Sequence, residues 1–570
     1  MPARTYQLAQ SPLFQDVSEH LPLKRRIALS YERAIAIGRA YQLTADDVRN
    51  TTSKYWELHS DPIMPMDGAA GSLISIHYNL AVGTFARYTK GRPDVEAILH
   101  RLLTFQVFGQ FCLTELGHGL DARNLETTAT VLPDGSIDLH TPYDRAAKHM
   151  PPTSPTGMPC MAVVFARLVV EGEDRGIKPF AVLMHDGFNM SQGITAKTLP
   201  PRGGSHPMEH CLTYFNHVNL PHTALLASAS RDVDDRAAFF DNIHRVVVGT
   251  MSIAGLSIAS MRVGAYIAGR YSQRRKVIDA YTGASRPIIS FTTQQIPILS
   301  TIAQVVVFKS FVKRAIALFT DKNIGHDLKH CVASIAKTVC IKHCHGNLIA
   351  LSDRCGAQGV FEVNQLSVMH ADYRGAAIAE GDILGISVRF AVELLLGRVK
   401  LPASTNPESL LARHAASMFS ELRNTLASRF QHHRDPEFQS IVLPQCQPLM
   451  EAFGHAMAYD AAVADGVDAR VLDMFVASIM KEDSAWYTEV GGVSRATQKE
   501  MERRAVERLL PSLDALLQDL DVEAYCSAPI ISDEKWKRYV DGLPTFTHQR
   551  PTQHSFARYQ PEKVQIRAVL

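Results

Sequence analysis

The sequence lacks the one-sided charge that a non-specific nucleic-acid binder needs. Its 570 residues carry 59 lysines and arginines against 57 aspartates and glutamates. So even a balance gives no long-range field that attracts a polyanion. We therefore expect no nucleic-acid partner, and any basic site must be local.

An apolar run long enough to cross a bilayer is also lacking. A spanning helix needs about 20 consecutive apolar residues, and no stretch of the sequence approaches that length. The start, Met1–Tyr6, has no apolar run behind its charge, as a secretory signal would have. We expect a soluble intracellular protein that is neither secreted nor membrane-spanning.

The sequence has no cysteine framework either. Nine cysteines, an odd number, are scattered along the chain with no short domain around them. They are typical of the reduced, buried thiols of an intracellular protein. One apolar run includes an i, i+4 cysteine pair, but no second pair follows at zinc-site spacing, so packing rather than metal binding is expected for Cys340, His343, Cys344 and His345.

What the sequence does have is length and a changing hydrophobic period. A chain of 570 residues is too long for one core, so several domains are expected. Apolar residues recur at helical spacing in the first fifth, β-branched runs with turns follow, and the helical period then returns. The predicted fold is α+β, mainly α. Its predicted domains are residues 1–112 (helical), 113–225 (barrel-like β), 226–400 (helical bundle) and 401–570 (second helical domain and tail).

Individual elements can be placed within these domains. The turn Pro133-Asp-Gly135 separates two β-branched runs and predicts a hairpin of Glu126–Leu132 with Ser136–His140. Long helices with more than one apolar side must pack on each other as a bundle. The further strands are expected at Met161–Val170, Pro179–Met184 and Leu212–Val218, and the long helices at 236–271, 294–320, 325–353 and 378–398.

The first motif lies where the helical period gives way to the β period. It reads Leu113-Thr-Glu-Leu-Gly-His-Gly119. Gly117 and Gly119 permit close backbone approach, and Thr114 offers both an N–H and an O–H to a ring edge rich in heteroatoms. A plain glycine-containing loop at a domain junction is the alternative for the two glycines alone.

The second motif places a carboxylate beside small apolar residues. Arg354-Cys-Gly-Ala-Gln-Gly359 is followed by Ala379-Glu-Gly-Asp382. An apolar setting raises the pKa of a carboxyl group towards the working pH of a base, and the flanking 376–379 segment is compatible with such a setting. The alternative is that Glu380 stabilises the start of a helix near Ile383, an effect of about 0.3–1 kcal/mol.

The third motif is cationic. Tyr271-Ser-Gln-Arg-Arg-Lys276 is followed by Phe291-Thr-Thr-Gln-Gln295. The planar guanidinium of arginine suits phosphate oxygens, and a glutamine can fix a ribose or an adenine edge. A solvated cationic helix end is the alternative. Arg274 is a better phosphate candidate than Arg275.

Together the three motifs resemble those of the acyl-CoA oxidases, and the resemblance covers nearly all of the chain. It implies the acyl-CoA dehydrogenase/oxidase fold, FAD as cofactor, an acyl thioester substrate, O2 as electron acceptor and a homodimer. Glu380 would be the base that removes the α-proton of the thioester while the β-hydride passes to the flavin. The implied FAD contacts are Thr114, Gly119, Arg274, Gln294, Gly356, Gly359, Gly381 and Asp382, the segment around Gly356 and Gly359 being borrowed from the neighbouring chain.

Several family positions differ in this chain. Similar oxidases carry a Lys-Trp-Trp-Pro-Gly-Gly segment near the flavin and the thioester, whereas this chain reads Lys148-His-Met-Pro-Pro-Thr153. Gln358 and Val360 replace the usual histidine and tyrosine. These changes concern the floor and mouth of the substrate site, so we expect a non-standard acyl group, branched, aromatic or polyketide-like, carried on coenzyme A or on protein-bound pantetheine.

Two further interpretations remain open at this point. Electrons can pass to a protein acceptor, as in acyl-CoA dehydrogenases, although Leu116 with Gly117-His-Gly119 favours the oxidase branch. Alternatively, the chain is a non-catalytic subunit of the same fold, for which the altered 148–153 segment is the best support. The final residues Arg-Ala-Val-Leu570 are not a Ser-Lys-Leu type of peroxisomal address, so the compartment, cytoplasmic or peroxisomal, stays open.

Overall fold

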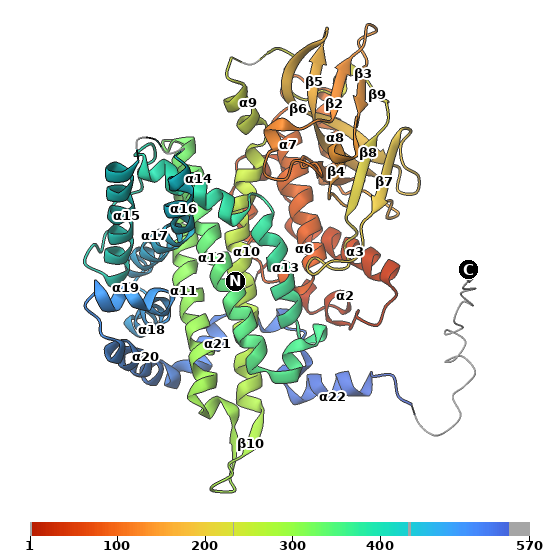
Figure 1. Cartoon of the computed structure of the whole chain (residues 1–570). Coiled ribbons are helices and arrows are strands. Elements are labelled where there is room, and N and C mark those ends of the chain that lie inside the picture. Colours follow the sequence, from red (N-terminus) through yellow and green to blue (C-terminus); the bar gives the residue numbers. More distant parts are fainter. Residues whose placement is uncertain (1–2, 232, 431, 433–434, 547–570) are drawn as a thin grey trace, which may run out of the picture.

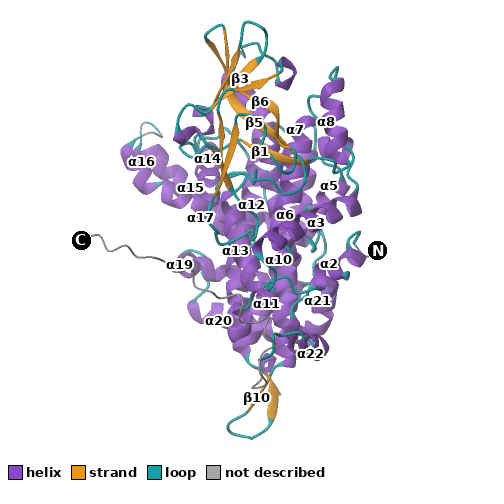
Figure 2. Cartoon of the chain, turned by 90° about the vertical axis from the view of Figure 1, so that its right-hand side faces the viewer, coloured by secondary structure: helices purple, strands orange, loops and turns teal. Residues whose placement is uncertain are grey.

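The computed structural model describes residues 3–546 except 232, 431, 433 and 434. Figure 1 shows a β domain at one end of a long helical body, and in Figure 2 the same domain lies at the top of an elongated molecule. The predicted order of helices, then strands, then helices is confirmed.

The N-terminal part is helical and packs beside the central bundle. Its longest helix, α3, carries a buried face of Ile27, Ala34, Ile37 and Tyr41. One segment, Ile76–Val82, is a π-helix, a rare form that often occurs at functional sites. The helices are α1 Tyr6–Ala9, α2 Pro12–Gln15, α3 Leu23–Tyr41, α4 Ala45–Arg49, α5 Ser53–Leu58, α6 Gly68–Ser75, α7 Gly83–Phe85 and α8 Pro93–Leu103.

The β domain contains a six-stranded sheet and a three-stranded sheet. In the larger one β5 is central: β1 and β2 pair with it in parallel, β6 pairs with it antiparallel, and β3 and β9 continue from β2. The smaller sheet has the order β4-β8-β7. The strands are β1 Phe108–Cys112, β2 Thr128–Val131, β3 Ile137–His140, β4 Lys148–His149, β5 Cys160–Val170, β6 Glu173–His185, β7 Ile194–Thr198, β8 Cys211–Phe215 and β9 Val218–Leu220.

The predicted hairpin is confirmed, since β2 and β3 pair antiparallel with Thr128 opposite His140. The other predicted strands are β5, part of β6, and β8 with β9. Phe108–Cys112, which the helical period had included, is strand β1, which pairs in parallel with Cys160–Val164 of β5. The polar strand β7 was not predicted.

The central body is a bundle of three long helices, α10 His244–Arg274, α11 Thr292–Thr320 and α12 His326–Arg354, which run lengthwise through the molecule (Figure 1). α10 alone among the helices in the described ranges is long and apolar enough to suit a membrane span. An 18-residue window of this helix has a mean hydropathy of 1.6, and 83% of the window is buried inside the protein. The expectation that no stretch approaches such a length was wrong, and burial among other helices explains the apolar run.

The predicted helix over 378–398 is corrected by the structure. Two helices occupy the region, α13 Leu366–Ile378 and α14 Ile383–Leu395, and a short turn of residues 379–382 separates them. Gly381 has a φ of 91°, a conformation that breaks a helix. Glu380 therefore lies in the turn and not in a helix.

The remaining elements complete the body. Between α10 and α11 a hairpin of β10 Lys276–Ile278 and β11 Ser285–Pro287 projects from the end opposite the β domain (Figures 1 and 2). Helix α9 Asp235–Asn242 contacts β6 of the β domain. Most of the later helices pack on one side of the bundle, whereas α22 Asp533–Asp541 lies on the other side (Figure 1). The later helices before α22 are α15 Leu410–Arg429, α16 Pro436–Ile441, α17 Leu443–Ala464, α18 Ala469–Met480, α19 Ser484–Glu489, α20 Arg495–Leu509 and α21 Leu513–Asp519.

Candidate active site

Glu380 occupies the turn between α13 and α14, and it does not cap the helix that follows. That role belongs to Asp382, whose Oδ1 accepts a hydrogen bond of 3.1 Å from the backbone N–H of Gly385. The interpretation of Glu380 as a helix-stabilising acid therefore has no support in the structure. The carboxylate of Glu380 is therefore not used as a helix cap.

Three consecutive carbonyl groups of this turn accept hydrogen bonds from buried side chains. The hydroxyl of Thr250 donates to Glu380 O at 2.7 Å. The ammonium group of Lys337 donates to both Ala379 O and Gly381 O. Helices α10 and α12 thus hold the backbone on both sides of the predicted base.

The carboxylate of Glu380 lies against the backbone of α10. A Cβ atom added to Gly249 would lie 2.3 Å from Glu380 Oε2, so only glycine leaves room for the carboxylate there. Oε2 is buried and has no hydrogen-bond partner. A buried carboxylate oxygen without a partner is expected at a site where a substrate supplies the missing proton.

A polar network around Arg245, one turn before Gly249 on α10, completes the surroundings. The guanidinium of Arg245 donates to Asn79 Oδ1 at 2.8 Å and to the backbone oxygens of Asn79 and Val48 at 2.8 and 3.0 Å. The Tyr55 hydroxyl donates to the same Asn79 Oδ1 at 2.9 Å. Asn79, which interacts with Glu380, belongs to the π-helix.

Burial raises the pKa of Glu380 to about 8, and the positive charges of Lys337 and Arg245 and the contact with Asn79 oppose that rise. Burial lowers the pKa of Lys337 to about 7, against the opposing effect of Glu380 and Asp382. A carboxyl group with a pKa near the working pH is suited to general-base catalysis.

The loop after β1 carries the first motif and is fixed by a buried ion pair. Lys148 donates to Glu115 Oε1 at 2.9 Å, and both side chains are 0% exposed. Glu115 also accepts from the backbone N–H groups of Glu126 and Thr127 at 2.7 and 3.0 Å. Thr114, next to Glu115, is half-buried, and its carbonyl accepts from the N–H of His149 at 2.9 Å.

This loop reaches the helix that follows Glu380. The side chain of Leu120 lies 3.7 Å from the position of a Cβ at Gly385 in the first turn of α14. Gly119 is exposed, with open space where a Cβ would lie. Four exposed apolar side chains belong to the two segments: Leu116, Leu120, Ile378 and Leu384. An exposed apolar group of this kind marks a surface for a ligand or a partner.

The altered 148–153 segment is ordered within the smaller sheet and next to it. Lys148 lies in β4, which pairs with β8. The carbonyl of Met150 accepts from Nδ1 of His210 at 2.6 Å, and Thr153 shares a 2.7 Å hydrogen bond with Thr213. The segment therefore keeps the lysine that supports Glu115, whereas its aromatic residues are replaced.

The third motif lies at the far end of the long helices. Arg274, the last residue of α10, donates to Asp533 Oδ1 at 2.6 Å. Gln294 donates to Arg354 O at 3.4 Å, and its Oε1 is buried without a partner. Gln294 and the Arg354–Gly359 segment, two parts of the predicted site, are therefore neighbours.

The two predicted glycines of that segment have different environments. Gly356 has a φ of 58°, and open space lies where a Cβ would be. At Gly359 an added Cβ would lie 2.1 Å from Ser352 O, so this glycine is required by packing on the end of α12. Open backbone at Gly356 suits the approach of a ligand, whereas Gly359 shapes the loop.

The two halves of the predicted site lie far apart within one chain. Gly249, next to Glu380, and Arg274 both belong to α10, and a helix rises 1.5 Å per residue, which separates them by about 37 Å. The β domain with Thr114 and the β10–β11 hairpin next to Arg274 lie at opposite ends in both views (Figures 1 and 2). One chain does not bring Glu380, Thr114, Arg274 and Gln294 together.

Five residues that surround Glu380 were not predicted from the sequence, namely Asn79, Arg245, Gly249, Thr250 and Lys337. A signal existed for Lys337, because it is a lone lysine within the apolar run of residues 331–341. No spacing in the sequence relates Asn79 or Arg245 to residue 380. Only the packing of the π-helix and α10 brings them to it.

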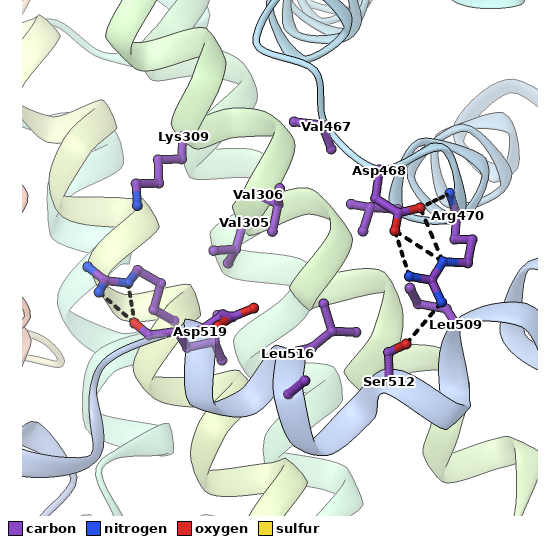
Figure 3. A pocket seen from close by; sticks show the side chains of 14 residues that line it. Val305, Val306, Lys309, Val467, Asp468, Arg470, Leu509, Ser512, Leu516 and Asp519 are labelled. Carbon is purple, nitrogen blue, oxygen red and sulfur yellow. Dashed lines mark hydrogen bonds and ion pairs between the residues drawn. The ribbon is translucent and has the colours of Figure 1, made fainter.

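A cavity of about 390 Å³ lies between α10, α11, α18, α20 and α21 (Figure 3). Its apolar wall includes Val305, Val306 and Leu516, and Lys309 and Arg470 lie at its edges. Arg262 of α10 lines it and is separated from Gly249 by about 20 Å along the helix. The cavity is therefore separate from the site around Glu380.

Comparisons with known proteins find similar sequences and a shared fold. Residues 245–395, which include Arg245, Lys337 and Glu380, match the model of the acyl-CoA oxidase C-alpha1 domain. In this region the chain is similar to acyl-CoA oxidases. A putative peroxisomal acyl-coenzyme A oxidase 1.2 of Arabidopsis thaliana is 27% identical over 345 residues, which cover 56% of this chain and 52% of that protein. Peroxisomal acyl-coenzyme A oxidase 3 of Homo sapiens is 25% identical over 342 residues, or 54% of this chain and 47% of that protein.

The match thus spans about half the length of these curated relatives of the acyl-CoA oxidase family. Solved structures share the fold over a greater length. Acyl-CoA oxidase 1 of Yarrowia lipolytica has a TM-score of 0.79 at 18% identity and covers 98% of this chain and 93% of its own. A complex of Caenorhabditis elegans acyl-CoA oxidase-1 with FAD and ATP has a TM-score of 0.77 at 16% identity, with coverage of 95% and 90%.

Proposed function

We propose that this chain is an FAD-dependent acyl thioester oxidase that forms a double bond between the α and β carbons of the acyl group. The observation that carries the proposal is the buried Glu380 carboxylate. It has a raised pKa, one oxygen without a partner, and a backbone held on three consecutive carbonyls. A structural acid needs none of these features.

Glu380 would act as the base. The carbonyl of a thioester acidifies the adjacent C–H bond, and the free Oε2 of Glu380 accepts that proton. The contact with Gly249 and the hydrogen bond from Thr250 hold the carboxylate in one place as the proton moves. When bound, FAD supplies the acceptor for the hydride that leaves the β-carbon.

The residues present fit a flavin cofactor. Thr114 is half-buried in a loop fixed by the Lys148–Glu115 pair, and Gly119 and Gly356 leave open space for close approach. Gln294 Oε1 is a buried acceptor without a partner, as an adenine or ribose contact requires. We assign these residues, with Arg274, Gly359, Gly381 and Asp382, to cofactor binding or to the shape of its site.

We further propose that two chains form each site. The distance between Glu380 and Arg274 along α10 is too great for one dinucleotide to span. The β10–β11 hairpin exposes Ile278 and Tyr281, which are 68% and 99% exposed, beside the Arg274 end. A homodimer in which this end meets the Glu380 end of the partner would complete two sites with one symmetric interface.

The substrate is proposed to be an acyl-CoA or pantetheine-bound acyl group with a branched, aromatic or polyketide-like chain. The support is the replacement of bulky aromatic residues by His149, Met150 and Pro151 in an otherwise ordered segment. For the compartment we propose the peroxisome, because the similar proteins are named as peroxisomal.

The test is anaerobic flavin bleaching. The purified full-length chain should be yellow, should bleach with members of a panel of straight, branched and aromatic acyl-CoA thioesters, and should not bleach after Glu380→Gln. Admission of air should then release hydrogen peroxide, whereas slow reoxidation would indicate a protein acceptor. Colourless protein that binds no added FAD would favour a non-catalytic subunit and end the proposal.

A further inference from the structure

Lys337 is a fully buried lysine in the middle of α12, and its ammonium group faces the turn that carries Glu380. It donates to Ala379 O and Gly381 O, the carbonyl groups on either side of Glu380. Among the residues that the structure describes, no carboxylate lies within 4 Å of Lys337 Nζ as an ion-pair partner. Its charge is therefore compensated by backbone oxygens and by more distant acids.

The turn needs such support because of its conformation. Glu380 has a φ of 57°, which is uncommon for a residue with a Cβ atom. Such a conformation persists only where the surroundings determine it. Here Lys337 from α12 and Thr250 from α10 supply the three hydrogen bonds that fix it.

The charged groups that face Glu380 come from several elements. Arg245 of α10 and Lys337 of α12 are the cations, and Asp382 is the acid on its own turn. Tyr55 of α5 is neutral and hydrogen-bonded to Asn79. Arg245 is already committed to the oxygens of Asn79 and Val48. Lys337 is thus the cation whose hydrogen bonds go to the turn of Glu380 itself.

We propose that Lys337 is the positioning residue for Glu380. It fixes the turn through two backbone carbonyls, and its positive charge favours the ionised carboxylate that can accept a proton. The inference rests on the proposed function for its catalytic consequence. Its structural part concerns the titration of Glu380 and can be measured without turnover.

Two variants separate the two effects. Lys337→Met removes both the charge and the hydrogen bonds, whereas Lys337→Gln removes the charge and keeps an amide that can donate to the carbonyls. The matched control is Lys342→Gln, a lysine five residues further along α12 that pairs with Glu451 and Glu482 and lies outside the turn.

The first readout is infrared titration of the protonated carboxyl band of Glu380, identified as the band that Glu380→Gln abolishes. An opposite charge at this range shifts a carboxyl pKa by one unit or more, so we expect both Lys337 variants to raise the midpoint by about one pH unit. In the control Lys342→Gln, the carboxyl band of Glu380 should have the same titration midpoint as in the wild-type protein. Equal midpoints in wild type and both Lys337 variants would overturn the proposal.

The second readout is the rate of anaerobic bleaching with the fastest acyl-CoA of the panel, measured above the titration midpoint. There Lys337→Gln should recover most of the wild-type rate, whereas Lys337→Met should stay at least about tenfold slower because the carboxylate is displaced. If Lys337→Met does not fold, Lys337→Gln still decides the effect of the charge.

The two proposals fail in different ways. Wild-type protein that no thioester bleaches, combined with a shifted titration in the variants, contradicts the proposed enzyme and leaves the positioning of Glu380 standing. Wild-type protein that bleaches, combined with an unshifted titration in both variants, contradicts the role of Lys337 alone.

Discussion

The Glu380 carboxylate rests directly on the α-carbon of Gly249, at a distance that leaves no room for a methyl group. The proposed base, in the turn between α13 and α14, is thereby located by a residue 131 positions earlier in α10.

Gly249→Ala should displace the carboxylate and lower the rate of anaerobic flavin bleaching. A misplacement of about 1 Å in a reacting group costs about 100-fold in rate. The control is Gly346→Ala on α12, where open space lies around the glycine. Alanine in an exposed helix position stabilises by about 1 kcal/mol, so this control should keep its rate and unfold at a slightly higher temperature. An unchanged rate in Gly249→Ala would contradict the contact.

The rate should depend on pH through the ionisation of Glu380. Because burial raises its pKa to about 8, the base is mostly protonated at pH 7 and becomes active as the pH rises through 8. For bleaching by acyl-CoA, kcat/KM reports the free enzyme and should rise about tenfold from pH 6.5 to 7.5 before it levels off above 8. The same shift has the opposite effect on stability, because a group with a raised folded pKa loses its contribution as the pH rises through that value. A profile that levels off near pH 5 would contradict the buried setting.

Removal of the lysine from the buried Lys148–Glu115 pair should loosen the loop around Thr114. Lys148→Met leaves the Glu115 charge without its cation, which costs about 3–5 kcal/mol in a buried pair. Hydrogen exchange over residues 108–131 should show a lower free energy of local opening, and FAD should bind more weakly. The double variant Lys148→Met/Glu115→Gln should recover part of the lost free energy of local opening, because it no longer buries an unpaired charge.

The exposed pair of Lys313 and Asp465 serves as the control for this prediction. Lys313→Met should change local opening by less than about 1 kcal/mol, because surface ion pairs contribute little. Equal effects of Lys148→Met and Lys313→Met would show that the buried pair does not support the loop.

Sites built from two chains should complement each other in mixed dimers. Neither Glu380→Gln nor Arg274→Glu should bleach alone. Reassembly of an equal mixture makes about half of the dimers mixed, and each mixed dimer has one intact site, so about a quarter of wild-type activity should return. Activity that stays near zero after reassembly would indicate that Glu380 and Arg274 serve the same site from one chain, or that Arg274 has no part in it.

The sequence by itself determined the succession of helical, β and helical parts, because a hydrophobic period of 3.6 or 2 residues is local information. Local composition also marked the glycine-containing loop after Cys112, whereas the carboxylate at position 380 was singled out by the resemblance of its motif to those of acyl-CoA oxidases. The sequence misplaced the helix over 378–398, because a turn of four small or acidic residues barely interrupts the apolar pattern of α13 and α14.

Only the tertiary structure decided what Glu380 can do. Gly249, Thr250 and Lys337 reach it because α10 and α12 pack side by side, and Asn79 reaches Arg245 because a π-helix of the N-terminal part lies against α10. The pKa of a carboxyl group depends on burial and on charges that are distant in sequence, and no local pattern encodes either. The separation of Arg274 from Glu380 is likewise a property of a long straight helix, and it places the two residues at opposite ends of one chain.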